Sequence, residues 1–211
     1  MELVTQFIDI VLHLDVHLAL LIQQYGIWVY AILFVIIFSE TGLVVTPFLP
    51  GDSLLFIAGA LAAMGQLDVH LLIISLIAAA FLGNALNFRI GRYFGPKVFS
   101  NPHSRLLKPA YLERARQFYE RHGGKTIVLS RFLPIIRTYA PFVAGASQMG
   151  SARFLAYNLV GATLWVAGLT YAGYFFGNLT IVRENLTLII LALVIIPALP
   201  ALAEFVRVQR R

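Results

Sequence analysis

The chain has 211 residues, of which 59% are hydrophobic and 12% are charged, whereas soluble domains carry about 25% charged residues. This composition excludes an ordinary water-soluble domain and predicts a membrane protein along most of its length. The net charge is +6, and there is no cysteine, which excludes disulfides and thiolate metal sites.

Residues 1–25 mix apolar positions with acidic and histidine side chains, a pattern that suits a helix lying at the membrane interface. Residues 27–63 then form an apolar run that is too long for one span of about 20 residues and barely long enough for two. Pro47 and Pro50 must break any helix in the middle of this run. Because broken backbone at membrane depth has to be shielded from lipid, we predict a re-entrant hairpin or broken span here.

Residues 71–88 are predicted to cross the membrane fully, since they are apolar and lead into a basic stretch. Nine of the sixteen basic residues lie between Arg89 and Lys125. In so apolar a chain this clustering indicates a cytoplasmic loop over 89–125 rather than a nucleic-acid site, because positively charged loops are retained inside. The second part of the loop, residues 111–122, has the pattern of a short amphipathic helix that stops at two glycines.

Residues 126–149 are apolar again but carry four residues that lipid-facing helices avoid: Arg131, Pro134, Arg137 and Pro141. A second re-entrant segment is therefore predicted here. Two plain spans are predicted to follow, at 154–176 and 186–206. If 126–149 returns to the cytoplasmic side, these spans leave the last three arginines in the cytoplasm, as the positive-inside rule requires.

Two short strings recur in the same order and indicate an internal repeat. The string PFLPG at 47–51 resembles PFVAG at 141–145, and GRYFG at 91–95 resembles GYFFG at 173–177. The topology above puts the two glycine strings at opposite membrane faces, so the halves would be inverted, as in many secondary transporters. The predicted fold is an all-α polytopic membrane protein that forms one domain over 1–211. It has two proline-broken re-entrant hairpins in an inverted repeat, three to four full spans and interfacial amphipathic helices.

Four charged residues within the broken segments are the strongest functional signal: Glu40 and Asp52 in the first, Arg131 and Arg137 in the second. Each would cost roughly 2.5–3.5 kcal/mol at mid-bilayer, so we predict a shared, sheltered cavity. Arginine binds phosphate bidentately, and a poorly solvated carboxylate can exchange a proton. These residues therefore predict phosphate binding by the arginines and proton exchange by the carboxylates. The alternative is that they form purely structural salt bridges.

A second group of residues is expected to support this site. The glycines and prolines among them would let the hairpins bend and move: Pro47, Pro50, Gly51, Pro134, Pro141 and Gly145. Asn84, Asn87, Arg89 and Arg92 lie toward the end of the predicted span 71–88, where ligand contact and interfacial anchoring explain them equally well. Enzyme signatures such as G-x-S-x-G, H-E-x-x-H and the P-loop are missing, so no enzyme activity, catalytic residue, cofactor or metal is expected.

Three long segments resemble signatures of the DedA family: FSETGLVVTPFLPGDSLL at 38–55, GNALNFRIGR at 83–92 and RFLPIIRTYAPFVAG at 131–145. The resemblance implies a multi-pass protein of the bacterial inner membrane with two opposed re-entrant hairpins, related to eukaryotic lipid scramblases. It also implies links to the proton-motive force and to the return of undecaprenyl phosphate, the carrier lipid of cell-wall synthesis. The family's acidic pair corresponds to Glu40 and Asp52, and its arginine pair to Arg131 and Arg137. The middle motif usually carries aspartate where this chain has Asn84, which puts a carboxylate role there in doubt.

Residues and resemblance together predict a lipid-phosphate flippase that moves undecaprenyl phosphate across the inner membrane with proton coupling and has a cytoplasmic C-terminus. The expected partners are an anionic membrane lipid and protons, without nucleic acid, and the chain is compatible with an oligomer. The alternatives are a proton-coupled transporter of small ions or cationic compounds, a phospholipid scramblase, and a membrane scaffold that transports nothing.

Overall fold

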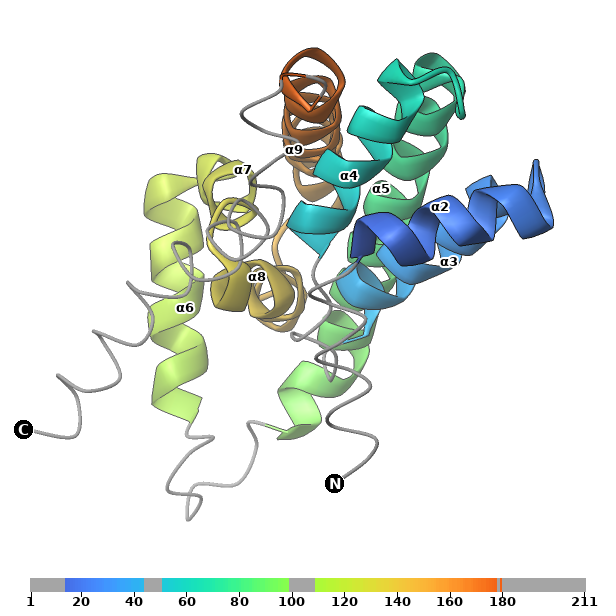
Figure 1. Ribbon diagram of the computed structural model, residues 1–211. Helices are drawn as coiled ribbons and strands as arrows, with labels where there is room; N and C mark the ends of the chain where they lie inside the picture. Colours follow the sequence, from blue (N-terminus) through green and yellow to red (C-terminus); the bar gives the residue numbers. More distant parts are fainter. Residues whose placement is uncertain (1–13, 44–50, 99–108, 178, 180–211) are drawn as a thin grey trace, which may run out of the picture. The chain divides into compact units, whose positions relative to one another are not determined.

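The computed structural model describes residues 14–43, 51–98, 109–177 and 179, and every regular element in these ranges is an α-helix. The helices, shown in Figure 1, are α2 (Leu14–Tyr25), α3 (Trp28–Gly42), α4 (Gly51–Ala63), α5 (Val69–Val98), α6 (Pro109–His122), α7 (Lys125–Ser130), α8 (Pro134–Ala146) and α9 (Ser151–Phe176). The predicted all-α class is thus confirmed for the described part of the chain. The predicted span 186–206 and the first half of the interfacial segment lie outside the described residues, and the number of spans stays a prediction.

Two of these helices are long and apolar enough to cross a membrane, judged by length and composition. They extend over Val69–Gly95 and Ser151–Phe176, which is 27 and 26 residues. Each is about 40 Å long, against a hydrocarbon thickness of about 30 Å. Helix α5 continues past the end predicted for its span, as far as Val98, and Pro96 lies within its last turn. Arg89 and Arg92 therefore lie on a helix rather than in a loop.

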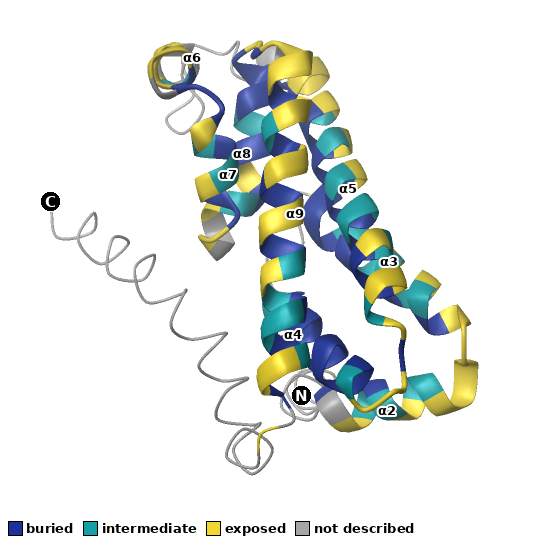
Figure 2. Cartoon of the chain, turned by 90° about the horizontal axis from the view of Figure 1, so that it is seen from above, coloured by how far each residue is buried: buried dark blue, intermediate teal, exposed yellow. Residues whose placement is uncertain are grey.

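The two segments predicted to be broken each contain two short helices. In the first, α3 and α4 have 15 and 13 residues, fewer than the roughly 20 needed to span a membrane. Helix α4 is buried along most of its length (Figure 2). In the second, α7 and α8 have 6 and 13 residues and are joined by a turn at 131–133. Pro134 begins α8, where its missing N–H costs no helical hydrogen bond, but Pro141 lies inside α8 and does not break it. Pro47 and Pro50 fall outside the described residues.

The chain divides into two compact units. The first holds α2, α4, most of α3, α5 up to Leu76 and α9 from Val166. The second holds α6, α7, α8, α3 from Ile37, α5 from Ile77 and α9 up to Trp165. Three of the four charged residues singled out above belong to the second unit, whereas Asp52 belongs to the first.

Each unit contains a close crossing of a short helix with the C-terminal part of a long one, and both crossings use the same sequence pattern. In the first unit the α4 string FIAGA at 56–60 meets α9, where a Cβ atom added to Gly173 would overlap the carbonyl of Phe56. In the second unit the α8 string FVAGA at 142–146 meets α5, where a Cβ atom added to Gly91 would overlap the carbonyl of Phe142. The crossings therefore need glycine for the backbones to touch.

The internal repeat is present in this packing, but its register differs from the predicted one. FVAGA at 142–146 corresponds to FIAGA at 56–60 rather than to PFLPG at 47–51. Gly51 opens α4 whereas Gly145 is the second-last residue of α8, so these two glycines lie at opposite ends of their helices. The predicted match between the strings at 91–95 and 173–177 agrees with the packing. Gly95 faces Ala146, the last residue of FVAGA, and Gly177 faces Ala60, the last residue of FIAGA.

The second unit has an aromatic core that joins α5, α6 and α9. Phe88 of α5 stacks on Phe154 of α9, with ring centroids 4.1 Å apart and an interplanar angle of 15°. Tyr119 of α6 is buried in the same cluster and donates a hydrogen bond to the carbonyl of Ala140 in α8 at 3.0 Å. Gly123, in a left-handed conformation with φ of 66°, then ends α6. Tyr119 thus ties the amphipathic helix α6 to α8.

Tyr119 is expected to make the protein less stable at alkaline pH. It lies outside the candidate spanning helices, and burial raises the pKa of its hydroxyl from 10.0 to about 12. The unfolded chain ionises near pH 10 while the folded chain stays protonated, so this contribution is intact below about pH 10 and is lost as the pH rises toward about 12. We expect the Tm advantage of the wild type over Tyr119→Phe, measured in detergent, to shrink between about pH 8 and pH 11. An advantage that stays constant over this range would contradict the assignment.

Candidate functional site

The centre of the candidate site is an ion pair in the second unit. Glu40, near the C-terminal end of α3, accepts a hydrogen bond from the guanidinium of Arg137 on α8. Their side chains are 2% and 10% exposed. A charge-assisted hydrogen bond between buried partners is strong, and removing either partner leaves a charge without compensation. The predicted meeting of a carboxylate from the first broken segment with an arginine from the second is therefore found in this pair.

Arg131 lies in the turn between α7 and α8, and its residue is 3% exposed. Its Nη2 donates to the side-chain oxygen of Asn158 at 2.7 Å and to the carbonyl of Ala80 at 3.2 Å. Its Nε has no hydrogen-bond partner, and no carboxylate pairs with it among the described residues. Glu40, Arg137 and Arg131 together carry one excess positive charge, because one carboxylate balances only one of the two guanidinium groups.

Asn84 of α5 lies beside Arg131. In one amide orientation its nitrogen donates to Asn158 at 3.1 Å. In the other, its oxygen accepts from Arg131 at 2.9 Å and its nitrogen donates to the carbonyl of Thr41 at 3.2 Å. Asn84, which stands where the family's motif usually has aspartate, therefore contacts the Arg131 guanidinium through a neutral amide. This leaves the charge of Arg131 uncompensated.

Asn87, one turn further along α5, connects the two helices that carry the ion pair. Its side-chain nitrogen donates to the carbonyl of Thr138 on α8 at 2.9 Å and to that of Thr41 on α3 at 3.3 Å. Thr41 is the second-last residue of α3, where carbonyl groups lack a donor within the helix. Because the side chain is fully buried, these bonds hold the end of α3 against α8 and so place Glu40 near Arg137.

Trp165 of α9 provides an aromatic face for both arginines. The guanidinium carbon of Arg137 lies 5.0 Å from the ring centroid, and that of Arg131 lies 5.8 Å from it. Both distances are within the range of cation–π attraction. The indole is 2% exposed, so it stabilises the two guanidinium groups without bringing a negative charge.

Other predicted residues lie apart from the ion pair or in the first unit. Arg92 is exposed on α5 and donates to the Ser151 hydroxyl at the start of α9, which suits an anchoring role. Gly145 faces the carbonyl of Phe88 in the helix crossing. Gly51 and Asp52 form the first turn of α4 in the first unit, so the proton-exchange role of Asp52 stays a prediction.

Two residues of the site, Asn158 and Trp165, were not singled out by the sequence analysis. Asn158 holds Arg131 and also donates to the carbonyl of Phe81 at 3.0 Å. A signal for it was available, because an uncharged polar residue inside the apolar run 154–176 is expected to bond to a neighbouring helix. Trp165 also lies within the apolar run 154–176, and its side chain is buried. Its contact with arginines distant in the sequence had no local signal.

The comparisons with known proteins agree on one family. The VTT domain matches residues 49–175 of this chain. Protein DedA of Escherichia coli strain K12 is 55% identical over 212 residues, which cover 100% of this chain and 97% of DedA. Uncharacterized membrane protein ML0287 of Mycobacterium leprae is 46% identical over 168 residues, covering 80% of this chain and 75% of its own. Inner membrane protein YqjA of Escherichia coli is 37% identical over 180 residues, covering 84% and 80%.

No solved structure matches this chain. The VTT domain nevertheless covers more than half of it, and the similarity to DedA extends over its full length. The chain therefore belongs to the DedA family of membrane proteins.

Proposed function

We propose that this protein is a lipid-phosphate translocase of the bacterial inner membrane, with undecaprenyl phosphate as its lipid and a cytoplasmic C-terminus. The observation that carries the proposal is the buried Arg131, which has no carboxylate partner among the described residues and lies beside the Glu40–Arg137 pair. A buried cation without a counterion is unfavourable, so an anion that enters the site is stabilised there. A phosphate carried on a lipid has the matching charge and reaches the site from the membrane.

The same geometry suggests how binding is coupled to protons. A phosphate that takes over the guanidinium of Arg137 displaces Glu40 from its partner. A buried carboxylate without a cation beside it favours the protonated form, so Glu40 takes up a proton as the phosphate binds. Binding with proton uptake strengthens as the pH falls, and release of the phosphate returns the proton. Asp52 is proposed as a second proton-exchanging group on the first unit.

The test is flipping of a fluorescent polyprenyl phosphate in reconstituted vesicles. Glu40→Gln combined with Arg137→Gln removes both charges while keeping hydrogen-bonding groups of similar size, so the variant is expected to fold. It should lower the flipping rate at least about tenfold, which corresponds to about 1.4 kcal/mol. Arg114→Gln, at an exposed position on α6, should stay within about twofold of the wild type.

Equal rates for the wild type and the neutral-pair variant would contradict the proposal. The same would follow if an uncharged polyprenol crossed the membrane as fast as the phosphate, because the excess positive charge would then play no part in selecting the lipid.

A further inference from the structure

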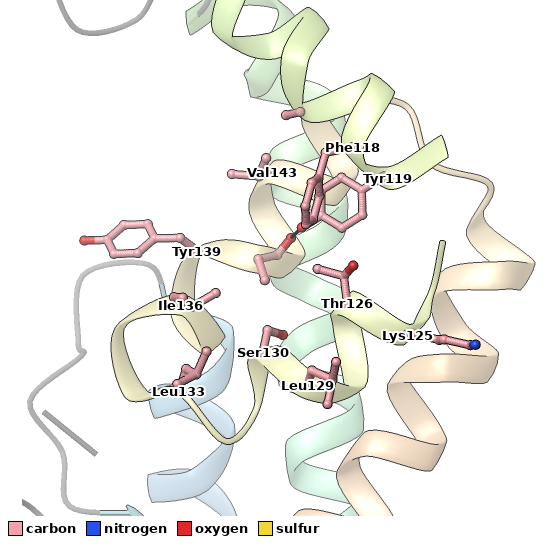
Figure 3. A pocket seen from close by; sticks show the side chains of 12 residues that line it. Phe118, Tyr119, Lys125, Thr126, Leu129, Ser130, Leu133, Ile136, Tyr139 and Val143 are labelled. Atoms are coloured by element: carbon pink, nitrogen blue, oxygen red, sulfur yellow. Dashed lines mark hydrogen bonds between the residues drawn. The ribbon is translucent and has the colours of Figure 1, made fainter. Parts of the chain in front are cut away.

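The second unit has a large apolar groove that the proposed phosphate site does not use. We call it the α6–α8 groove, since its walls come from α6, α7 and α8 (Figure 3). Its volume is about 640 Å³, within the range of sites that bind small molecules. Most of the lining is aliphatic or aromatic, and it includes Phe118, Leu129, Leu133, Ile136, Tyr139 and Val143.

Four residues with a hydroxyl group line the groove, and two of these hydroxyls, those of Tyr119 and Ser130, donate hydrogen bonds within the protein. The Tyr119 hydroxyl donates to the carbonyl of Ala140 at 3.0 Å, and the Ser130 hydroxyl donates to the carbonyl of Ile127 at 2.9 Å. A ligand in the groove therefore gains apolar contact and few hydrogen bonds. These properties fit a hydrocarbon chain better than a soluble metabolite or a peptide, whose polar groups would be left without partners.

The one charged side chain in the lining is Lys125, at the start of α7. It is exposed, and neither a hydrogen bond nor an ion pair joins it to another described residue. Figure 3 shows its ammonium group at one end of the groove, directed away from the apolar side chains, while Tyr139 marks the other end. An apolar channel with a cation at one end has the charge pattern of an anionic lipid, which carries its headgroup at the end of its chain.

The turn between α7 and α8 separates this groove from the buried ion pair. Ser130 and Ile136 line the groove. Their neighbours in the sequence, Arg131 and Arg137, instead contact Asn158 and Glu40. Helices α7 and α8 therefore direct some of their side chains into the groove, whereas Arg131 and Arg137 contact residues outside it.

We propose that the α6–α8 groove binds one hydrocarbon chain of an anionic, phosphate-bearing membrane lipid, with the lipid headgroup at Lys125. This site goes beyond the proposed translocation, because none of its residues belongs to the Glu40–Arg137–Arg131 cluster. Burial of a chain at about 25 cal/mol per Å² of apolar surface supplies the affinity, and Lys125 supplies the preference for a negative headgroup.

The experiment uses the full chain in phosphatidylcholine nanodiscs that contain phosphatidylglycerol with a photoactivatable diazirine in one acyl chain. After illumination, crosslinked peptides are identified by mass spectrometry. We expect the label on groove residues of α6, α7 and α8 at several times the level on the exposed Leu159 face of α9. The same diazirine chain on phosphatidylcholine should label the groove less in the wild type.

Two variants with a matched control complete the test. Leu129→Trp narrows the groove and should lower its labelling about fivefold or more, whereas Leu159→Trp makes the same change at another exposed leucine and should leave it unchanged. Lys125→Gln should abolish the preference for phosphatidylglycerol over phosphatidylcholine. Groove labelling no higher than that of the Leu159 face, or labelling unaffected by Leu129→Trp, would overturn the proposal, as would a groove covered by a second copy of the chain. A lipid preference retained in Lys125→Gln would overturn the headgroup assignment.

Discussion

Replacing Glu40 by glutamine alone is expected to lower the free energy of unfolding by about 3–5 kcal/mol, because it leaves Arg137 buried without its counterion. For a chain of this size such a loss corresponds to a fall in apparent Tm of roughly 10 °C, measurable by thermal unfolding in detergent. Glu113→Gln, at an exposed position on α6, is the matched control and should change the Tm by no more than about 2 °C.

A double-mutant cycle measures the interaction energy between Glu40 and Arg137 separately from the effect of each single substitution. Arg137→Gln alone should be as destabilising as Glu40→Gln, whereas the double variant should lose less stability than either single variant, so the coupling energy should be at least about 3 kcal/mol. The reversed pair, Glu40→Arg with Arg137→Glu, restores opposite charges and distinguishes a scaffold from a translocase. A scaffold should work with the reversed pair, whereas the proposed phosphate site should not. No coupling between the two positions would contradict the ion pair itself.

Much of the fold could be predicted because its determinants are local. The length of the apolar run 27–63 and the prolines within it were enough to predict a break in this run, and α3 ends before these prolines while α4 begins after them. The glycines after His122 were enough to end α6 at its observed position. By contrast, Pro141 remains inside α8, since a proline weakens a helix by one hydrogen bond and one steric clash, which tertiary packing can outweigh.

The sequence was enough to predict that carboxylates and arginines would meet in the site, but not which carboxylate pairs with which arginine. Both arginines suited Glu40 equally on sequence grounds, and the choice of Arg137 depends on how α3 and α8 meet at Asn87. Arg131 is instead held by Asn158 and Asn84, residues that are 74 positions apart in the sequence. No local pattern reports such a contact.

The register of the internal repeat was missed for a related reason. The predicted register pairs PFLPG with PFVAG, because both strings begin with proline and phenylalanine and end with glycine. The feature that actually recurs is the spacing of small residues in FIAGA and FVAGA, which decides how closely two helix backbones can approach. That spacing has an effect only when the partner helix also carries glycine at the crossing, as α5 and α9 do at Gly91 and Gly173.

Gly91→Ala is expected to destabilise the protein by about 1–3 kcal/mol, although alanine is the better helix former. The added methyl group would overlap backbone atoms of Phe142 on α8, and backbone cannot move aside as a flexible side chain can. Gly173→Ala at the equivalent crossing should have a similar effect, because its methyl group would overlap backbone atoms of Phe56 on α4. Both losses are measurable as a lower apparent Tm in detergent.

Gly168→Ala is the matched control on α9, since an added Cβ atom there meets no other atom within 4 Å. Alanine at this position should leave the free energy of unfolding unchanged or raise it by up to about 1 kcal/mol, because it restricts the unfolded chain and causes no clash in the folded one. The Tm should accordingly stay the same or rise. If Gly91→Ala and Gly173→Ala were as well tolerated as Gly168→Ala, the two crossings would not be close backbone contacts. If only one of them were tolerated, the helices of the two units would not share the recurrent packing pattern, and the repeat would be one of sequence alone.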